Sequence, residues 1–261
     1  MTGDHPEPPP QRHPGASVWA SGLTLDGARG TVYRDIDLDA PPGSLIALTG
    51  PSGSGRTCLL LTLTGRMRPS GGRASVHGLP LPRRMAAVRG LAALGPVDGV
   101  NELEPALTVA EQFHELALLE RRLGLASFAP PLPGSRARAR RQRRRDRAVA
   151  ALEAAGLDLS TLPKGSRTRV RDLDRLEALR LGVALALLSG PRLLAVDDLD
   201  LKLSDAERAD AWALLRSISE RGATVVATCS EAPEGALVVR TGPGSDRKEA
   251  ADDAFTTAGR A

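Results

Sequence analysis

Short, strongly apolar segments alternate with longer helical patterns along this chain of 261 residues. Early in the chain, extended segments are predicted near residues 17–25, 31–39, 44–49, 73–78 and 91–97. Helical patterns then dominate from about 108 to 189. Apolar strands return at 193–196 and 223–228, with a helix predicted at 205–221 between them. Because apolar strands joined by a helix pair in parallel with right-handed crossovers, the pattern predicts an α/β protein with a parallel sheet.

The same pattern divides the chain into a sheet-bearing core, a helical insertion and two polar ends. We expect the core at 17–97 and 190–240, with a helical subdomain at 98–189 inserted between its halves. Residues 1–16 and 241–261 are rich in proline, glycine and charge, and are predicted to be disordered tails. Capping-box spacing marks two helix starts, at Thr108–Glu111 and Ser204–Glu207, and the stretch from Pro130 to Gly134 breaks the helical middle.

A glycine-rich loop follows the strand predicted at 44–49. It reads Gly50-Pro51-Ser52-Gly53-Ser54-Gly55-Arg56-Thr57 and opens onto an apolar helical run that starts at Cys58. Strand, glycine-rich turn and helix form the context of a phosphate-binding loop, in which backbone N–H groups and a helix N-terminus face the phosphates. Arg56 stands where such loops usually carry lysine, and its planar fork is a poor substitute for a compact ammonium. The residues predicted to bind the phosphates are Gly50, Ser52, Gly53, Ser54, Gly55, Arg56, Thr57 and Cys58.

Two adjacent carboxylates follow the apolar strand at 193–196. Asp197 and Asp198 lie at its carboxyl end, the edge where open α/β sheets bind ligands. Asp197 and the hydroxyl of Thr57 are predicted to hold Mg²⁺, the former directly or through water. Asp198 is the predicted catalytic residue, which would polarise an attacking water. The alternative is an ordinary acidic turn after a strand, which the upstream glycine-rich loop makes less favourable.

Taken in order, these segments resemble the nucleotide-binding domain of ABC transporters, from about Ser17 to Thr241. The resemblance is carried by Asp35-Ile36-Asp37-Leu38, Pro42-Gly43, the loop from Gly50 to Thr57, Leu107-Thr108-Val109 and Pro191-Arg192-Leu193-Leu194-Ala195-Val196-Asp197-Asp198. It implies a P-loop NTPase fold, with a RecA-like core flanked by helices, an antiparallel β subdomain and an inserted α-helical subdomain. It also implies that the chain binds ATP and Mg²⁺, dimerises with an identical or a different cassette, and serves a membrane permease from the cytoplasmic face of the membrane.

Several positions depart from the working residues of that family. Asp26 or Gly27 replaces the aromatic residue that stacks on adenine, and Asp98 or Gly99 replaces a glutamine. Tyr33 is expected to belong to the core, and Gln112 is expected to face solvent. Asp198 is one methylene shorter than the family's catalytic glutamate.

Three further departures concern residues expected to have structural roles instead. Leu173-Asp174-Arg175-Leu176-Glu177 takes the place of Leu-Ser-Gly-Gly-Gln, and Asp174 is predicted to cap a helix through Ala186. Cys229 takes the place of a histidine. It could be a reactive thiol, but its position at the end of an apolar strand favours a small buried residue. Ser204 replaces an aspartate and is predicted to be an N-cap.

The sequence therefore predicts an ATP-binding transporter subunit with a degenerate catalytic set, in which hydrolysis is slow or depends on a partner. One alternative is a pseudo-ATPase, a regulator or scaffold that binds nucleotide without turnover. A second is a nucleic-acid-associated ATPase that uses the arginine run at 136–147, where eight arginines surround one aspartate. No aromatic residue interleaves this run to stack on bases, so a solvated helix face is favoured over nucleic-acid binding. A contact with anionic lipid headgroups beside a membrane partner is a third possibility.

Composition adds few constraints. No apolar run reaches the roughly 18 residues needed to span a bilayer, and the polar, proline-rich start does not read as a signal peptide. The two cysteines, Cys58 and Cys229, indicate no disulfide framework, in keeping with the cytoplasm. The net charge of +4 is concentrated in the arginine run, so the rest of the chain is net acidic.

Overall fold

A computed structural model describes residues 15–28, 30–122 and 134–242. Five strands form a parallel sheet in the order β6-β7-β8-β3-β9. Their bounds are β6 (Ala92–Leu94), β7 (Leu193–Val196), β8 (Thr224–Thr228), β3 (Leu45–Thr49) and β9 (Leu237–Arg240). Every paired neighbour in this sheet is parallel. The predicted α/β fold with a parallel sheet is confirmed.

The three central strands of the parallel sheet, β3, β7 and β8, are buried at every position, and their residues are apolar except for threonines at strand ends. Along β3, Ile46 and Leu48 pack into one hydrophobic core, whereas Leu45 and Ala47 pack into the other. The first core contains α1 (Arg56–Leu63), and the second contains α5 (Arg175–Leu187) and α6 (Asp205–Glu220). Because successive side chains along a strand point to opposite faces of the sheet, β3 contributes to the hydrophobic cores on both faces.

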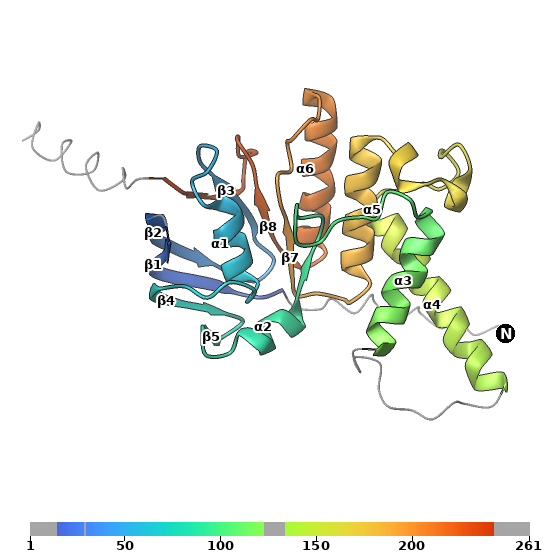
Figure 1. The fold of residues 1–261 in the computed structure, drawn as a ribbon, viewed down its shortest axis with the longest axis horizontal. Coiled ribbons are helices and arrows are strands. Elements are labelled where there is room, and N and C mark those ends of the chain that lie inside the picture. The colour runs from blue at the N-terminus through green and yellow to red at the C-terminus, as the bar shows by residue number, and fades with distance from the viewer. Residues whose placement is uncertain (1–14, 29, 123–133, 243–261) are drawn as a thin grey trace, which may run out of the picture.

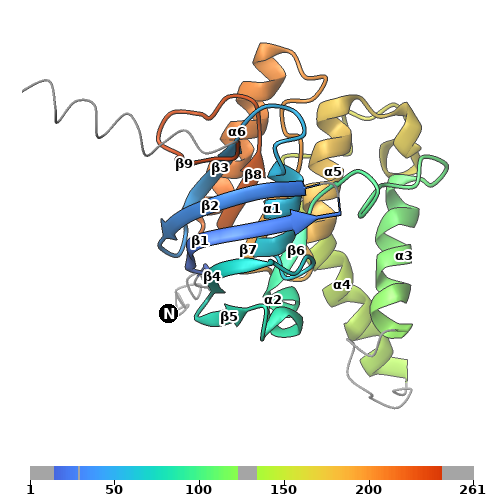
Figure 2. The ribbon, with the colours of Figure 1, turned by 60° about the vertical axis from the view of Figure 1, so that its left-hand side comes forward.

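Four further strands form an antiparallel sheet in the order β2-β1-β4-β5. They are β2 (Gly30–Ala40), β1 (Val18–Gly27), β4 (Gly71–Val76) and β5 (Leu79–Leu81). Figure 2 shows β1 and β2 in front of α1, and the apolar residues of the antiparallel sheet share the core that contains this helix. Tyr33 of β2 is 2% exposed, and its hydroxyl donates to Thr62 Oγ1 of α1 at 2.8 Å, so its expected place in the core is confirmed.

The helical subdomain lies beside the far edge of the parallel sheet (Figure 1). It contains α3 (Val109–Arg122), α4 (Gly134–Ala154), α5 and two short 3-10 helices, η1 (Gly165–Arg167) and η2 (Val170–Asp172). The predicted break from Pro130 to Gly134 lies outside the described residues except for Gly134, where α4 begins. The arginine run therefore lies on α4, as the sequence indicates.

Several predictions made at the level of single residues need revision. Gln112 does not face solvent: it is 6% exposed, and its Nε2 donates to Glu104 O at 3.2 Å across the turn before α3. Ala16 and Thr241, at the inner edges of the expected tails, are both buried and bonded to the parallel sheet region. Three short elements, α2 (Met85–Leu91), β5 and β9, were not predicted.

Candidate functional site

The glycine-rich loop leaves β3 and enters α1, whose N-cap is Gly55. Gly50 has a φ of 150°, and a Cβ added there would lie 2.2 Å from Thr241 O. Gly53 has a φ of 78°, and a Cβ added there would meet no atom within 4 Å. The start of the loop, at Gly50, is therefore packed closely against the backbone of Thr241, whereas the tip of the loop, at Gly53, faces open space. Ser52, at the same tip, is exposed.

Hydrogen bonds fasten the loop to the end of β9. Ser54 N donates to Pro51 O at 3.1 Å, and Ser54 Oγ lies 2.6 Å from Thr241 Oγ1. Thr241 N in turn donates to Thr49 O at 2.7 Å, at the end of β3. The loop thus keeps a defined shape before any ligand binds, and its backbone N–H groups lie at the N-terminus of α1.

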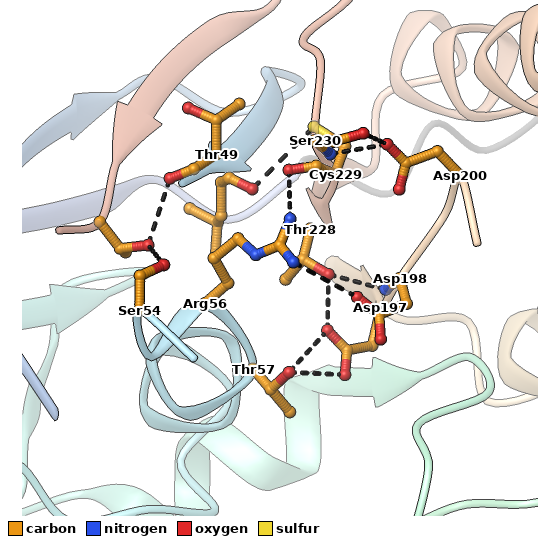
Figure 3. Close-up of polar contacts among 12 residues, drawn as sticks. Thr49, Ser54, Arg56, Thr57, Asp197, Asp198, Asp200, Thr228, Cys229 and Ser230 are labelled. Carbon is orange, nitrogen blue, oxygen red and sulfur yellow. Dashed lines mark hydrogen bonds and ion pairs between the residues drawn. The ribbon is translucent and has the colours of Figure 1, made fainter. Parts of the chain in front are cut away.

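Thr57 and Asp197, the two predicted metal ligands, lie in direct contact (Figure 3). Thr57 Oγ1 lies 3.1 and 2.9 Å from the two carboxylate oxygens of Asp197, within hydrogen-bond distance of both. Thr228 Oγ1 donates to Asp197 Oδ1 at 2.6 Å and accepts from Asp198 N at 2.7 Å. The ends of β7 and β8 and the start of α1 therefore meet at one carboxylate, which is 8% exposed.

Arg56 reaches across the site toward the same strand ends (Figure 3). Its Nη1 donates to Cys229 O at 2.6 Å, and its Nη2 lies 3.8 Å from Asp198 Oδ1. The Arg56 side chain is 16% exposed. A planar guanidinium can contact two acceptors at once, so this arginine braces the glycine-rich loop against β7 and β8.

Asp198, the predicted catalytic residue, has an unusual backbone and an altered acidity. Its φ of 43° lies in the left-handed region, which is uncommon for a residue with a side chain. Burial and the neighbouring charge of Asp197 raise the pKa of the Asp198 carboxyl, while Arg56 opposes that rise. The carboxylate of Asp198 is thus already engaged by a cation from the glycine-rich loop.

The residues present fit a magnesium ion that arrives with phosphate groups. A threonine hydroxyl and a carboxylate are the hard oxygen donors that Mg²⁺ prefers, and Mg²⁺ commonly completes its shell with water and phosphate oxygens. Over the described ranges, no group of three or more acidic, histidine or cysteine side chains could hold a metal alone. The donor set at Thr57 and Asp197 therefore fits a metal bound jointly with a nucleotide.

Other positions that depart from the family have local structural roles. The Asp174 side chain accepts from Glu177 N at 2.7 Å, and Asp174 N donates to Glu177 Oε2 at 2.9 Å, which completes a capping box on α5. Ser204 and Glu207 form the same device on α6. The predicted N-caps at Asp174 and Ser204 are therefore confirmed.

Cys229 and Asp26 are likewise committed to their surroundings. Cys229 is fully buried, and burial raises the pKa of its thiol to about 12. Burial also raises the pKa of the Cys58 thiol in the first turn of α1. The Asp26 carboxylate accepts from the hydroxyls of Thr31 and Ser70, at 2.9 and 3.1 Å. Asp98 and Gly99 lie in an exposed turn after β6.

Sequence reasoning missed three residues that organise the site. Thr228 links Asp197 to Asp198, Thr241 holds Ser54, and Asp200 accepts from Ser230 N at 2.6 Å. Burial raises the pKa of Asp200, but the hydrogen bonds from Ser230 outweigh it and leave the pKa below its usual value. For Thr228, the sequence does offer one signal of a role in the site, because it is a polar residue at the end of a buried strand.

A model of the family described as ABC transporter matches residues 33–199. The chain belongs to this family. Among similar proteins, a Nod factor export ATP-binding protein I from Cupriavidus pinatubonensis is 31% identical over 197 residues. That alignment covers 76% of this chain and 53% of the relative, so the chain spans about half the length of the relatives it matches. A ribose import ATP-binding protein RbsA 1 from Rubrobacter xylanophilus is 30% identical, over 76% of this chain and 36% of that protein.

Solved ABC structures share the fold. Clostridium perfringens cbiO1, described as part of the ABC transporter complex cbiONQ, aligns with a TM-score of 0.65 at 17% identity, over 93% of each chain. The ATP-binding cassette MJ0796, in a dimeric post-hydrolysis state bound to ADP and Pi, aligns with a TM-score of 0.61 at 20% identity. That alignment covers 82% of this chain and 88% of the cassette. In the described part of this ABC family member, no helix has the length and apolar character of a membrane span.

Proposed function

We propose that this chain is the ATP-binding subunit of an ABC-type transporter and binds Mg-ATP at the loop from Gly50 to Thr57. The observation that carries this proposal is the contact of Thr57 with Asp197, two oxygen donors of the kind that Mg²⁺ prefers, next to the glycine-rich loop. Family membership supports the same assignment.

Each predicted site residue has a defined part in this proposal. Backbone N–H groups between Gly50 and Cys58 face the phosphates, with the hydroxyls of Ser52 and Ser54 and the guanidinium of Arg56 as further donors. Thr57 and Asp197 hold Mg²⁺, which when bound neutralises charge on the phosphate oxygens. Thr228 keeps the Asp197 carboxylate in place. Asp198 accepts a hydrogen bond from the attacking water whenever hydrolysis occurs.

Hydrolysis is slow or depends on a partner. Asp198 Oδ1 lies 3.8 Å from Arg56 Nη2, so this cation competes with water for the carboxylate that would orient it. The buried Cys229 thiol is neutral near pH 7 and supplies no imidazole chemistry. Since Asp174 and Glu177 are engaged in capping α5, that helix start offers a carboxylate where the family offers a serine.

The proposed partners are a membrane permease and a second nucleotide-binding domain, identical or different. The helical subdomain contacts the permease, and the chain lies at the cytoplasmic face of the membrane. One matching relative is an export ATP-binding protein and another is an import ATP-binding protein, so the proposal covers both transport directions.

The pairing of Arg56 with Asp198 also favours a second candidate, a pseudo-ATPase whose nucleotide binding changes conformation without turnover. Steady-state phosphate release by wild type, Thr57→Ala and Asp198→Asn separates the two candidates. A slow ATPase shows a wild-type rate that both variants lower, Asp198→Asn by about a hundredfold if Asp198 is a working base. Equal, background-level release by all three proteins, each still folded, would assign the chain to the pseudo-ATPase class.

A further inference from the structure

A cavity of about 860 Å³ opens between the start of α3 and the two 3-10 helices, away from the nucleotide site. We call it the basic cavity, because it is lined by Lys164, Arg167, Arg169 and Arg171, with Glu111 and Asp172 as its only carboxylates among the described lining residues. None of these residues has a role in the proposed binding of Mg-ATP.

The backbone holds the cations of the basic cavity in place. Val109 N donates to Thr168 O at 3.0 Å, and Val170 N donates to Leu107 O at 2.9 Å, so the segment is tied to the start of α3 on both sides of Arg169. Thr168 and Val170 are 1% and 8% exposed, while the residues that alternate with them are exposed. Arg167, Arg169 and Arg171 are therefore presented to solvent by a fixed segment.

Each of the two carboxylates at the cavity already has a partner, Thr108 for Glu111 and the lining Arg171 for Asp172. Glu111 Oε2 accepts from Thr108 N and Thr108 Oγ1, each at 2.8 Å. These bonds, with a smaller contribution from Arg169, lower the pKa of the Glu111 carboxyl. Asp172 Oδ1 lies 3.8 Å from Arg171 Nε. Within the described ranges no salt bridge involves Lys164, Arg167 or Arg169, so the cavity keeps an excess of positive charge.

The shape and exposure of the basic cavity select among anionic ligands. An exposed ion pair contributes only about 0–1 kcal/mol, so a small free anion would be held weakly by these solvated side chains. A protein segment covers the cations, excludes water and strengthens every pair. The surface is concave, unlike the flat surface of a bilayer, and none of the described residues that line it is an aromatic that could stack on nucleic-acid bases.

We propose that the basic cavity is a docking site for an acidic segment of a partner protein. The proposal rests on the proposed function in one respect, since that function supplies a reason for a partner. The cavity is connected to the nucleotide site through the chain: α5 begins shortly after η2, and at its first residue Arg175 Nε donates to Leu201 O at 3.2 Å. Leu201 lies in the turn that follows Asp198.

The test uses the full chain and a labelled synthetic peptide of about 15 residues, long enough to form a helix, with glutamates four positions apart. Its glutamine counterpart is the neutral control peptide. Binding is measured by fluorescence anisotropy for wild type, Arg167→Glu/Arg169→Glu and the matched control Arg143→Glu/Arg145→Glu on α4. We expect the cavity variant to weaken binding by at least about tenfold and the α4 variant to change it less than about threefold. Binding should also weaken with salt.

Three results would overturn the docking proposal: no binding of the acidic peptide to wild type at low salt, equal binding by wild type and the cavity variant, or a loss confined to the α4 variant. Inorganic pyrophosphate binding as tightly as the peptide, and only when the cavity is intact, would reassign the site to a small anion. Calorimetry with Mg-ATP on the same samples keeps the two proposals apart. A cavity variant that binds Mg-ATP normally but loses the peptide supports docking, and a wild type that binds the peptide alone contradicts only the nucleotide assignment.

Discussion

The two sides of the nucleotide site are stabilised in different ways. On the side of the glycine-rich loop, much of the shape comes from the main chain: Gly50 packs against Thr241 O, and Ser54 N donates to Pro51 O. On the opposite side, where β7 and β8 end, the chemistry depends on side chains, and there Asp198 pairs with Arg56 while Cys229 is buried.

Under the proposed function, this difference accounts for a site that binds nucleotide but hydrolyses it slowly. Backbone N–H groups are present whatever the side chains are, so a phosphate cradle persists when Arg56 stands in place of lysine. Acid–base groups are defined by their side chains, and each positioned group typically contributes about 10²- to 10⁴-fold in rate. A substitution among the side chains at the ends of β7 and β8 is therefore expected to lower the rate of hydrolysis directly.

The largest expected effect comes from Gly50→Ala. Its Cβ would meet Thr241 O at 2.2 Å, a backbone atom that cannot move without displacing β9. We expect a loss of about 3 kcal/mol or more in the free energy of unfolding, from overpacking and strain together. Gly53→Ala is the matched control, because it also has a positive φ but meets nothing, and it should cost about 1 kcal/mol. Urea unfolding that ranks the two variants equally would contradict the close approach at Gly50.

The next effect concerns Cys229 and pH. Its thiol pKa is raised by burial from 9.0 to about 12, so at pH 9 the folded protein holds far less thiolate than the unfolded chain. Alkylation by iodoacetamide should therefore be on the order of a hundredfold slower in the folded protein than in urea. Since the folded pKa is the higher one, the stability from the neutral thiol is present below pH 9 and is lost as pH rises toward 12. Rapid labelling of Cys229 in the folded state at pH 9 would show that it is a reactive thiol.

A third prediction tests the metal pair. Asp197→Asn removes the charge that Thr57 and Thr228 orient, so the affinity for ATP in Mg²⁺ should fall by about tenfold or more. Affinity measured in EDTA should change much less. Asp210→Asn, on the exposed face of α6, is the control and should leave both affinities unchanged. If Asp197→Asn also binds Mg-ATP normally, the metal site lies elsewhere.

The smallest effect is expected for Arg56→Lys. Arg56 uses two separate nitrogens for Cys229 O and Asp198, and a lysine replaces this planar fork with one compact ammonium. The protein without nucleotide should therefore lose about 1 kcal/mol in unfolding free energy. Arg143→Lys on the exposed part of α4 is the matched control, with no expected change. Unaltered stability of Arg56→Lys would mean that the brace across the site contributes nothing.

Much of the core could be predicted because its strands are continuous apolar runs. The segments at 44–49, 193–196 and 223–228 coincide closely with β3, β7 and β8, and such runs have few alternatives to a buried parallel sheet. The elements that were missed, α2, β5 and β9, are short, and two of the four residues of β9 are exposed. Short elements of this kind are defined by their neighbours, which periodicity does not register.

The candidate site was predictable in its parts but not in their contacts. Gly50 to Thr57 and Asp197 carry local motifs, which is why they could be found. The direction of Arg56 depends on where Cys229 O and Asp198 lie, and these are distant in sequence. Gln112 was assigned to solvent because its bond to Glu104 O depends on a turn that only the folded chain forms.

The most direct test of the central claim is a calorimetric titration of Mg-ATP into the folded, nucleotide-free protein. The account predicts saturable binding with one site per chain, which requires Mg²⁺ for full affinity and is weakened in Thr57→Ala. No binding heat at several temperatures, in a sample that unfolds cooperatively, would contradict it.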